Sequence, residues 1–286
     1  MTAQKHILAC IDGSAVTESI CSYAAWYASR LNISVGILHA IDVPASTRRN
    51  LSGAIGMDSR QSLLEELTQL DEHRAKIANS YSKALVQDAK SYINSHYEVD
   101  VNIYQRRGKL LPSIEHFKAK NHAIVMGRRG EDHKNSQINI GSHIETVARA
   151  SDVPILICSD EFKVPRSYMI AFDASKTAIK AIDMIAQSLL LKDLQGYIVM
   201  VGNQNDTARE CLVAATEKLT LAGFKVEAYH SSLFDTVSGL LTFQADNDVD
   251  IIVVGAYGHS KLRQLFLGSI TTEIIASTRS PIILVR

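Results

Sequence analysis

The sequence predicts an α/β protein made of two tandem doubly wound domains, each a five-stranded parallel sheet flanked by helices. Apolar segments of strand length alternate with amphipathic segments of helix length, which is typical of βαβ units in a parallel sheet. The same order of segments occurs twice along the chain. At 286 residues, of which 46% are hydrophobic, the chain is long enough for two domains with a buried core each.

The elements follow the same plan in both halves. Each half begins with a short strand that ends in an acidic turn, followed by a helix, a second and a third strand, a fourth strand that ends in glycine, and a fifth strand that begins after proline. In the first half we expect strands at residues 7–11, 34–41, 99–105, 122–126 and 155–158, with the first helix at 15–31. In the second half we expect strands at residues 168–172, 196–201, 225–230, 250–254 and 282–285, with the first helix at 176–191.

The halves differ by about 33 residues that the first half carries in addition, in an insertion at about 45–96. Residues 62–93 have the amphipathic pattern of a long helix, and residues 47–60 before it are expected to form a mobile loop. That loop is either a lid over a site or an ordinary surface insertion. A short polar stretch ending in Pro165 marks the domain boundary, so the domains are expected at 1–159 and 165–286.

Composition excludes several classes of protein. Thirty basic and thirty acidic side chains balance, which does not favour binding to nucleic acid. The N-terminal residues lack the apolar core of a signal peptide, and no apolar stretch has the length of a membrane span, so a cytoplasmic protein is expected. The four cysteines form no C-x-x-C pair and are interpreted as reduced core residues. The ten histidines lack metal-ligand spacing, so no metal site is expected.

A glycine spacing that occurs twice is the most specific motif. Two glycines separated by two residues follow the fourth strand of each half, and a Gly-Ser pair follows after ten further residues in the first half and nine in the second. These residues are Gly127, Gly130, Gly141 and Ser142, and Gly255, Gly258, Gly268 and Ser269. Glycine permits close backbone approach, and the N–H groups at a helix start suit an anion. The motif therefore indicates a phosphate cradle at the carboxyl end of each sheet.

Charged residues near these glycines have two interpretations each. Asp12 and Asp173 follow the first strand of each half, where a carboxylate either accepts hydrogen bonds from a nucleoside or caps the following helix. Arg128 and Arg129, within the first glycine loop, either pair with phosphate oxygens or remain solvated or paired with nearby acidic residues.

Taken together, these residues resemble the universal stress protein family in its tandem form. The second half matches the G-x2-G-x9-G-(S/T) pattern of ATP-binding members without a gap, and the resemblance covers almost the entire chain. It implies an adenine nucleotide alpha hydrolase-like fold, with ATP, alone or with magnesium, as the ligand. The first half departs by one additional residue before Gly141, which shifts amides that must converge on one phosphate.

Carried over residue by residue, the resemblance implies an ATP site in each half. The site of the second domain would use Asp173, Val201, Gly255, Gly258, Gly268 and Ser269. A possible site in the first domain would use Asp12, Ala40, Gly127, Gly130, Gly141 and Ser142.

The expected function is ATP binding, foremost in the second domain, by a regulator or sensor of the stress response. No catalytic residues stand out and neither a Walker A nor a dinucleotide motif occurs, so at most slow ATP hydrolysis or autophosphorylation is expected. The alternatives are a weak ATPase and a non-nucleotide interaction protein whose ligand is a lipid, a metal or a protein. Pairing of the fifth strands, 155–158 and 282–285, would make an internal pseudo-dimer, and association of two chains would make a homodimer.

Overall fold

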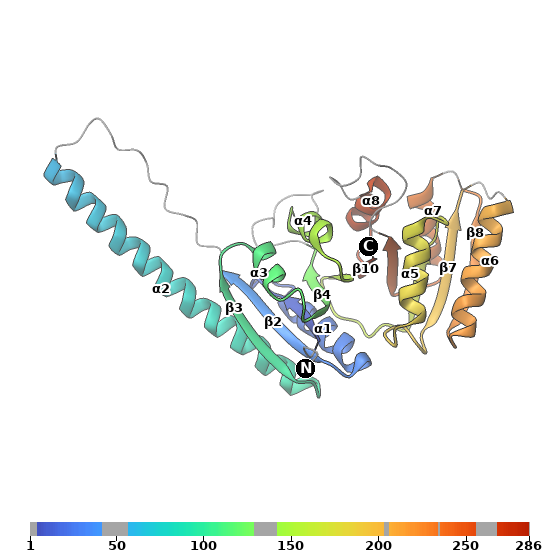
Figure 1. Ribbon diagram of the computed structural model, residues 1–286, viewed down its shortest axis with the longest axis horizontal. Coiled ribbons are helices and arrows are strands. Elements are labelled where there is room, and N and C mark those ends of the chain that lie inside the picture. The colour runs from blue at the N-terminus through green and yellow to red at the C-terminus, as the bar shows by residue number, and fades with distance from the viewer. Residues whose placement is uncertain are drawn as a thin grey trace.

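The computed structural model describes residues 5–41, 57–128, 142–202, 206–233, 235–255 and 268–285, with the backbone alone for residues 57–64 and 142. Strands and helices alternate in the expected order in both halves (Figure 1). The first half holds β1 (His6–Cys10), α1 (Thr17–Leu31), β2 (Ser34–Ile41), α2 (Met57–His96), β3 (Val101–Arg107), α3 (Leu110–His116), β4 (Asn121–Gly127), α4 (Ser142–Ala150) and β5 (Ile155–Cys158). The second half holds β6 (Ser167–Ala171), α5 (Lys176–Ala186), β7 (Gln195–Val201), α6 (Asp206–Leu221), β8 (Lys225–Ser231), α7 (Thr236–Asp246), β9 (Ile251–Gly255), α8 (Ser269–Ser277) and β10 (Ile282–Val285).

All ten strands belong to one sheet, in the order β3-β2-β1-β4-β5-β10-β9-β6-β7-β8. Neighbouring strands within each half run parallel, as right-handed βαβ crossovers require. The halves meet where β5 and β10 pair antiparallel, with Leu156 opposite Ile283. In each half the strand order reverses between the first and fourth strands, and such switch points are where open α/β sheets bind ligands.

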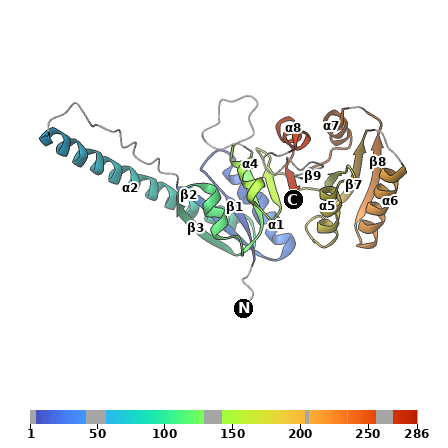
Figure 2. The ribbon, with the colours of Figure 1, turned by 45° about the horizontal axis from the view of Figure 1, so that its top comes forward.

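Helices cover both faces of the sheet (Figures 1 and 2). Side chains of α1, α2, α5 and α6 pack into one apolar cluster, and those of α3, α4, α7 and α8 pack into the other. Each cluster includes residues of both halves, so the core continues across the β5–β10 junction. The inner strands are apolar and almost wholly buried, as expected of parallel strands covered on both faces.

The two outermost strands have a different composition. β3 and β8 carry charged residues such as Arg106, Lys225 and Glu227 among their apolar ones, and several of their side chains are exposed. Charged side chains on edge strands discourage pairing with another chain. The edges of the ten-stranded sheet are therefore protected, while the apolar β5 and β10 pair with each other inside it.

Three helices have boundaries that differ from the sequence prediction. Helix α2 begins at Met57 rather than Ser62, so residues 57–60 are helical and not part of the expected loop; the rest of that loop lies outside the described residues. Helix α1 begins at Thr17 rather than Ala15, because the Thr17 N–H bonds to the Ser14 carbonyl in a turn before it. Helix α5 ends at Ala186, and a turn beyond it places Leu190 and Leu191 in the core.

Polar contacts supplement the strand pairing between the halves. The Arg30 guanidinium on α1 donates to the carbonyls of Leu190, Leu189 and Lys192 in the second half. In the connecting stretch, the Ser159 hydroxyl bonds to the Tyr23 hydroxyl at 2.9 Å, and Phe162 packs edge-on against the Tyr23 ring. The chain between the halves is thus held against α1.

Candidate functional site

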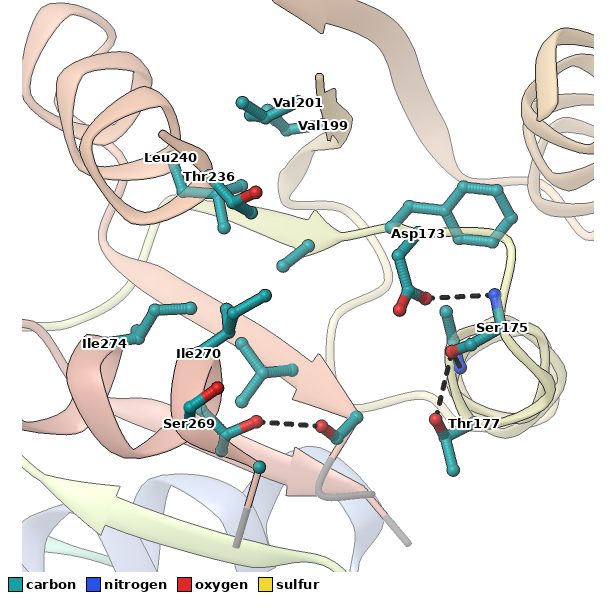
Figure 3. A pocket seen from close by; sticks show the side chains of 17 residues that line it. Asp173, Ser175, Thr177, Val199, Val201, Thr236, Leu240, Ser269, Ile270 and Ile274 are labelled. Atoms are coloured by element: carbon teal, nitrogen blue, oxygen red, sulfur yellow. Dashed lines mark hydrogen bonds between the residues drawn. The ribbon is translucent and has the colours of Figure 1, made fainter. Parts of the chain in front are cut away.

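A pocket of about 310 Å³ lies at the switch point of the second half, between β6, β7, β9 and the starts of α5, α7 and α8 (Figure 3). Five of the six residues predicted for the second-domain site line it: Asp173, Val201, Gly255, Gly268 and Ser269. The sixth, Gly258, lies outside the described residues. The structure therefore brings together residues that are up to 96 positions apart in the sequence.

The turn after β6 positions the carboxylate. Asp173 Oδ1 accepts a hydrogen bond from the Ser175 N–H at 2.9 Å, and Ala174 between them adopts a left-handed φ of 57°. The N-cap of α5 is Ser175, whose hydroxyl accepts from the Ala178 N–H at 3.2 Å. Because Ser175 provides the cap, Asp173 is not needed for that role, and its carboxylate points toward the pocket (Figure 3).

Gly255 ends β9 where the strand comes closest to α5. A Cβ at Gly255 would lie 3.1 Å from both Cβ and Oγ1 of Thr177, which is tighter than an ordinary van der Waals contact. The Gly255 carbonyl also accepts a hydrogen bond from Thr271 Oγ1 at 3.2 Å, which ties the strand end to the first turn of α8. A larger residue here would require Thr177 to shift by a few tenths of an ångström, so glycine suits this close packing.

Helix α8 begins at the pocket. Gly268 is its N-cap and supplies no side-chain hydrogen bond, and Ser269 is its first residue. The first N–H groups of a helix have no partner within the helix, and the helix dipole makes this end attractive to anions. The pocket thus has a polar side formed by Asp173, Ser175 and the start of α8. Val199, Val201, Leu240, Val254, Ile270 and Ile274 form its apolar side.

Helix α7 also contributes to the rim of the pocket through Thr236. Asp235 caps this helix, since its Oδ2 accepts from the Ser238 N–H at 2.8 Å, and these hydrogen bonds lower the pKa of the exposed Asp235 carboxyl. Asp235 is therefore a structural cap that stays ionised, next to the apolar wall that holds Leu240.

The equivalent positions of the first half are only partly described. Asp12 forms the same turn as Asp173, with its Oδ1 accepting from the Ser14 N–H at 3.0 Å. Ala40 lies on β2 and Gly127 ends β4. Ser142 begins α4, while Gly130 and Gly141 lie outside the described residues.

The inserted helix α2 packs over this first-half turn. Gly13, after Asp12, has φ 81°, and a Cβ there would lie 2.1 Å from the Tyr81 hydroxyl oxygen. The next residue of α2 is Ser82, whose hydroxyl bonds to the buried His39 ring at 2.7 Å. The Tyr81 hydroxyl thus lies where residue 13 would have its Cβ. In the second half, the corresponding residue is Ala174, whose own Cβ occupies that place.

Comparison with known proteins places the chain in a family. The model of the universal stress protein family matches residues 4–159 and 200–286. The universal stress protein Slr1230 of Synechocystis sp. is 32% identical over 287 residues, covering 99% of this chain and all of that protein. The chain belongs to the universal stress protein family.

Solved universal stress proteins share its architecture over the whole chain. One from Archaeoglobus fulgidus superimposes with a TM-score of 0.71 at 18% identity, covering 98% of both chains. A putative universal stress protein from Pseudomonas aeruginosa gives a TM-score of 0.60 at 13% identity, covering 99% of this chain and 94% of that one. At these identities the likeness concerns the fold, and it confirms two tandem α/β units.

Arg128 of this universal stress protein has a role that neither interpretation of the sequence included. Its guanidinium, at the end of β4, donates to the carbonyls of Ile275 and Ser280 in the second half, at 2.8 Å each. Ile275 lies in the last turn of α8, where carbonyls lack helical partners and a positive charge is favourable. Arg128 therefore holds the C-terminal end of the helix whose N-terminal end lines the pocket.

Several lining residues were missed by sequence reasoning. Thr177, Thr236 and Thr271 lie on three different helices and carry no motif. Ser175 had a detectable signal, because Asp-x-Ser before a helix is a capping pattern. Thr271 lies three residues after Gly268, a spacing that places both at one end of a helix.

The four cysteines lie outside the pocket, and three of them are buried. Burial raises the pKa of the Cys10 and Cys21 thiols to about 12, and it also raises that of Cys158, so all three stay protonated at neutral pH. Among the residues that the structure describes, no group of three His, Cys, Asp or Glu side chains is arranged to hold a metal ion. Within the same residues, no helix is long and apolar enough to cross a membrane.

Proposed function

We propose that this universal stress protein binds ATP in the pocket of its second domain and acts as a regulator of the stress response. The observation that carries the proposal is the convergence of Asp173, Val201, Gly255, Gly268 and Ser269 on one pocket. These are the described positions that match the ATP-binding pattern of the family.

The chemistry of the pocket fits a nucleotide in one orientation. Adenine would lie against the apolar side near Val199 and Val201, where its flat ring is removed from water. Asp173 would accept hydrogen bonds from the ribose hydroxyls. The phosphates would reach the start of α8, where free N–H groups and the Ser269 hydroxyl donate to anionic oxygens, with magnesium as a possible counter-ion.

Binding rather than turnover is the proposed activity. Among its described lining residues, the pocket contains a single carboxylate, Asp173. Phosphoryl transfer needs groups that hold the metal ion and position the attacking water, and one carboxylate near the ribose position does neither. We therefore expect ATP hydrolysis to be slow or undetectable. A bound nucleotide would act by favouring one conformation of the glycine loops over another.

The proposal includes the organisation and location of the chain. Residues 1–159 and 165–286 would act as two domains of an internal pseudo-dimer, which the antiparallel β5–β10 pairing supports. The four cysteines are free thiols, as is usual in the reducing cytoplasm, and this supports a cytoplasmic location. The first domain would bind nucleotide more weakly, since it has one additional residue between Gly130 and Gly141.

The test is calorimetric titration of magnesium-ATP into the wild type and the Asp173→Asn variant, with Asp12→Asn as the matched control. Asparagine keeps the oxygen that accepts from the Ser175 N–H but removes the charge, so the turn is retained. We expect Asp173→Asn to weaken binding about tenfold, the value of one charged hydrogen bond, and Asp12→Asn to leave it unchanged. Equal affinity in all three proteins would contradict the proposed site. An absence of binding by the wild type would favour a non-nucleotide ligand.

A further inference from the structure

The inserted helix α2 is much longer than the sheet needs. It has 40 residues, whereas the equivalent α6 of the second half has 16. At 1.5 Å per residue, α2 is about 60 Å long. Its C-terminal part packs on the sheet through buried residues such as Val86 and Ile93, while its N-terminal part projects away from the sheet (Figures 1 and 2).

The projecting part carries apolar side chains that stay largely exposed to solvent. None of the side chains from Glu65 to Tyr81 is buried. Leu67, Leu70 and Ile77, which we call the α2 stripe, are 43%, 45% and 57% exposed. At about 100° per residue, these three lie within an arc of roughly 80° on the helix. Their spacing of three and seven residues is that of a coiled-coil seam.

The charges along this part favour one arrangement of two copies. Residues 65–72 are acidic, with four carboxylates, and the next turns carry Arg74 and Lys76. In a parallel pair, Arg74 would face Arg74, and Glu66 would lie beside Asp71 of the second copy, so like charges would meet. In an antiparallel pair, the acidic segment of each copy lies along the segment of the other that carries Arg74 and Lys76.

We propose that α2 is the dimerisation element of this protein, through antiparallel coiled-coil pairing with α2 of a second copy. A register centred on residue 72 places Leu67 opposite Ile77 and Leu70 opposite Arg74. The Arg74 guanidinium then lies beside Asp71 of the second copy. Pairing in this register covers the α2 stripe of both copies at once. It accounts for the extra length of α2, which the fold of a single chain does not need.

The proposed interface is separate from the proposed nucleotide site. Helix α2 extends from the first half, whereas the pocket lies between α5, α7 and α8 of the second (Figure 1). Substitutions on the α2 stripe should therefore change the association of chains without changing the affinity for ATP. If one of the two proposals fails its test, the other is unaffected.

The first test is the mass of the full chain by sedimentation equilibrium across a wide range of concentration. We expect the wild type to form dimers and Leu67→Glu/Ile77→Glu to raise the dimer dissociation constant about 100-fold or more, because each change buries a charge in the seam. The matched control is Val213→Glu/Leu221→Glu, which alters two exposed apolar residues of α6. A wild type that stays monomeric overturns the proposal, as does a dimer that both double variants form equally well.

The second test determines orientation by disulfide cross-linking. Leu67→Cys and Ile77→Cys are made separately in chains in which Cys211, the one cysteine that is not buried, is replaced by serine. After mixing and mild oxidation, antiparallel pairing predicts cross-linked dimers in the mixture and very few in either protein alone. Cross-linking of Leu67→Cys by itself, as a parallel pair would give, overturns the proposed arrangement. Absence of cross-links in every sample overturns it as well.

Discussion

Replacement of Arg128 by alanine tests whether this residue joins the halves or binds phosphate. Its guanidinium makes two hydrogen bonds of 2.8 Å to the carbonyls of Ile275 and Ser280. A hydrogen bond to a charged group contributes about 1.5–3 kcal/mol. Arg128 is half-buried, so water partly replaces the lost donors and the lower end of that range applies to each bond. We expect Arg128→Ala to lower the free energy of unfolding by about 3 kcal/mol.

The assay is urea unfolding followed by circular dichroism and by the fluorescence of Trp26, the single tryptophan. Arg166→Ala serves as the control, because the Arg166 side chain makes a 3.8 Å ion pair with Asp248 in which both side chains are mostly exposed. Such pairs contribute about 0–1 kcal/mol. The affinity for ATP should change less than threefold in Arg128→Ala, since the guanidinium lies at the far end of α8. A stability loss no larger than that of the control, accompanied by a tenfold loss of ATP affinity, would refute this reasoning.

Three further predictions follow from buried groups. Burial lowers the pKa of His6, and Lys120 nearby adds to this effect, so the unfolded chain binds more protons near pH 6 than the folded one. Stability should therefore fall as the pH drops through about 6.5, and less steeply in His6→Gln, as measured by urea unfolding at several pH values. In Gly196→Ala, the new Cβ would lie 2.5 Å from the buried Tyr168 ring, which should cost about 2–3 kcal/mol in the same assay. Cys211 should react with a thiol reagent in the folded protein, whereas the other three cysteines should react after unfolding; rapid reaction of all four would contradict their burial.

The sequence predicted the parts of the fold that depend on local pattern. Buried parallel strands are continuous apolar runs, and each predicted strand is present with its ends shifted by no more than two residues. The glycines of the second half were found by their spacing; at Gly255 the close approach to Thr177 favours that residue type, whereas Gly268 has an ordinary φ of −56° and room for a Cβ. Because the same pattern occurs in both halves, the tandem architecture could be predicted as well.

Features that depend on contacts between distant segments were not predictable. Arg128 is separated from Ile275 by 147 positions, and the pattern of either segment gives no sign of the other. The position of Tyr81 beside Gly13 follows from how α2 crosses β2 and β3, which the amphipathic pattern of α2 does not specify. The role of Asp173 stayed open for a local reason: Asp173 and Ser175 are both capping residue types before α5, and the sequence does not say which of them caps it.

The measurement that tests the account most directly is the titration of magnesium-ATP into the wild type, Gly255→Val and Gly127→Val. Valine at Gly255 would press against Thr177, which lines the pocket, whereas Gly127 is the corresponding position at the end of β4. Circular dichroism should first show that each variant is folded. The account predicts that the wild type and Gly127→Val bind ATP with similar affinity and that Gly255→Val has lost binding. Binding that survives in Gly255→Val and disappears in Gly127→Val would place the nucleotide in the first half and contradict it.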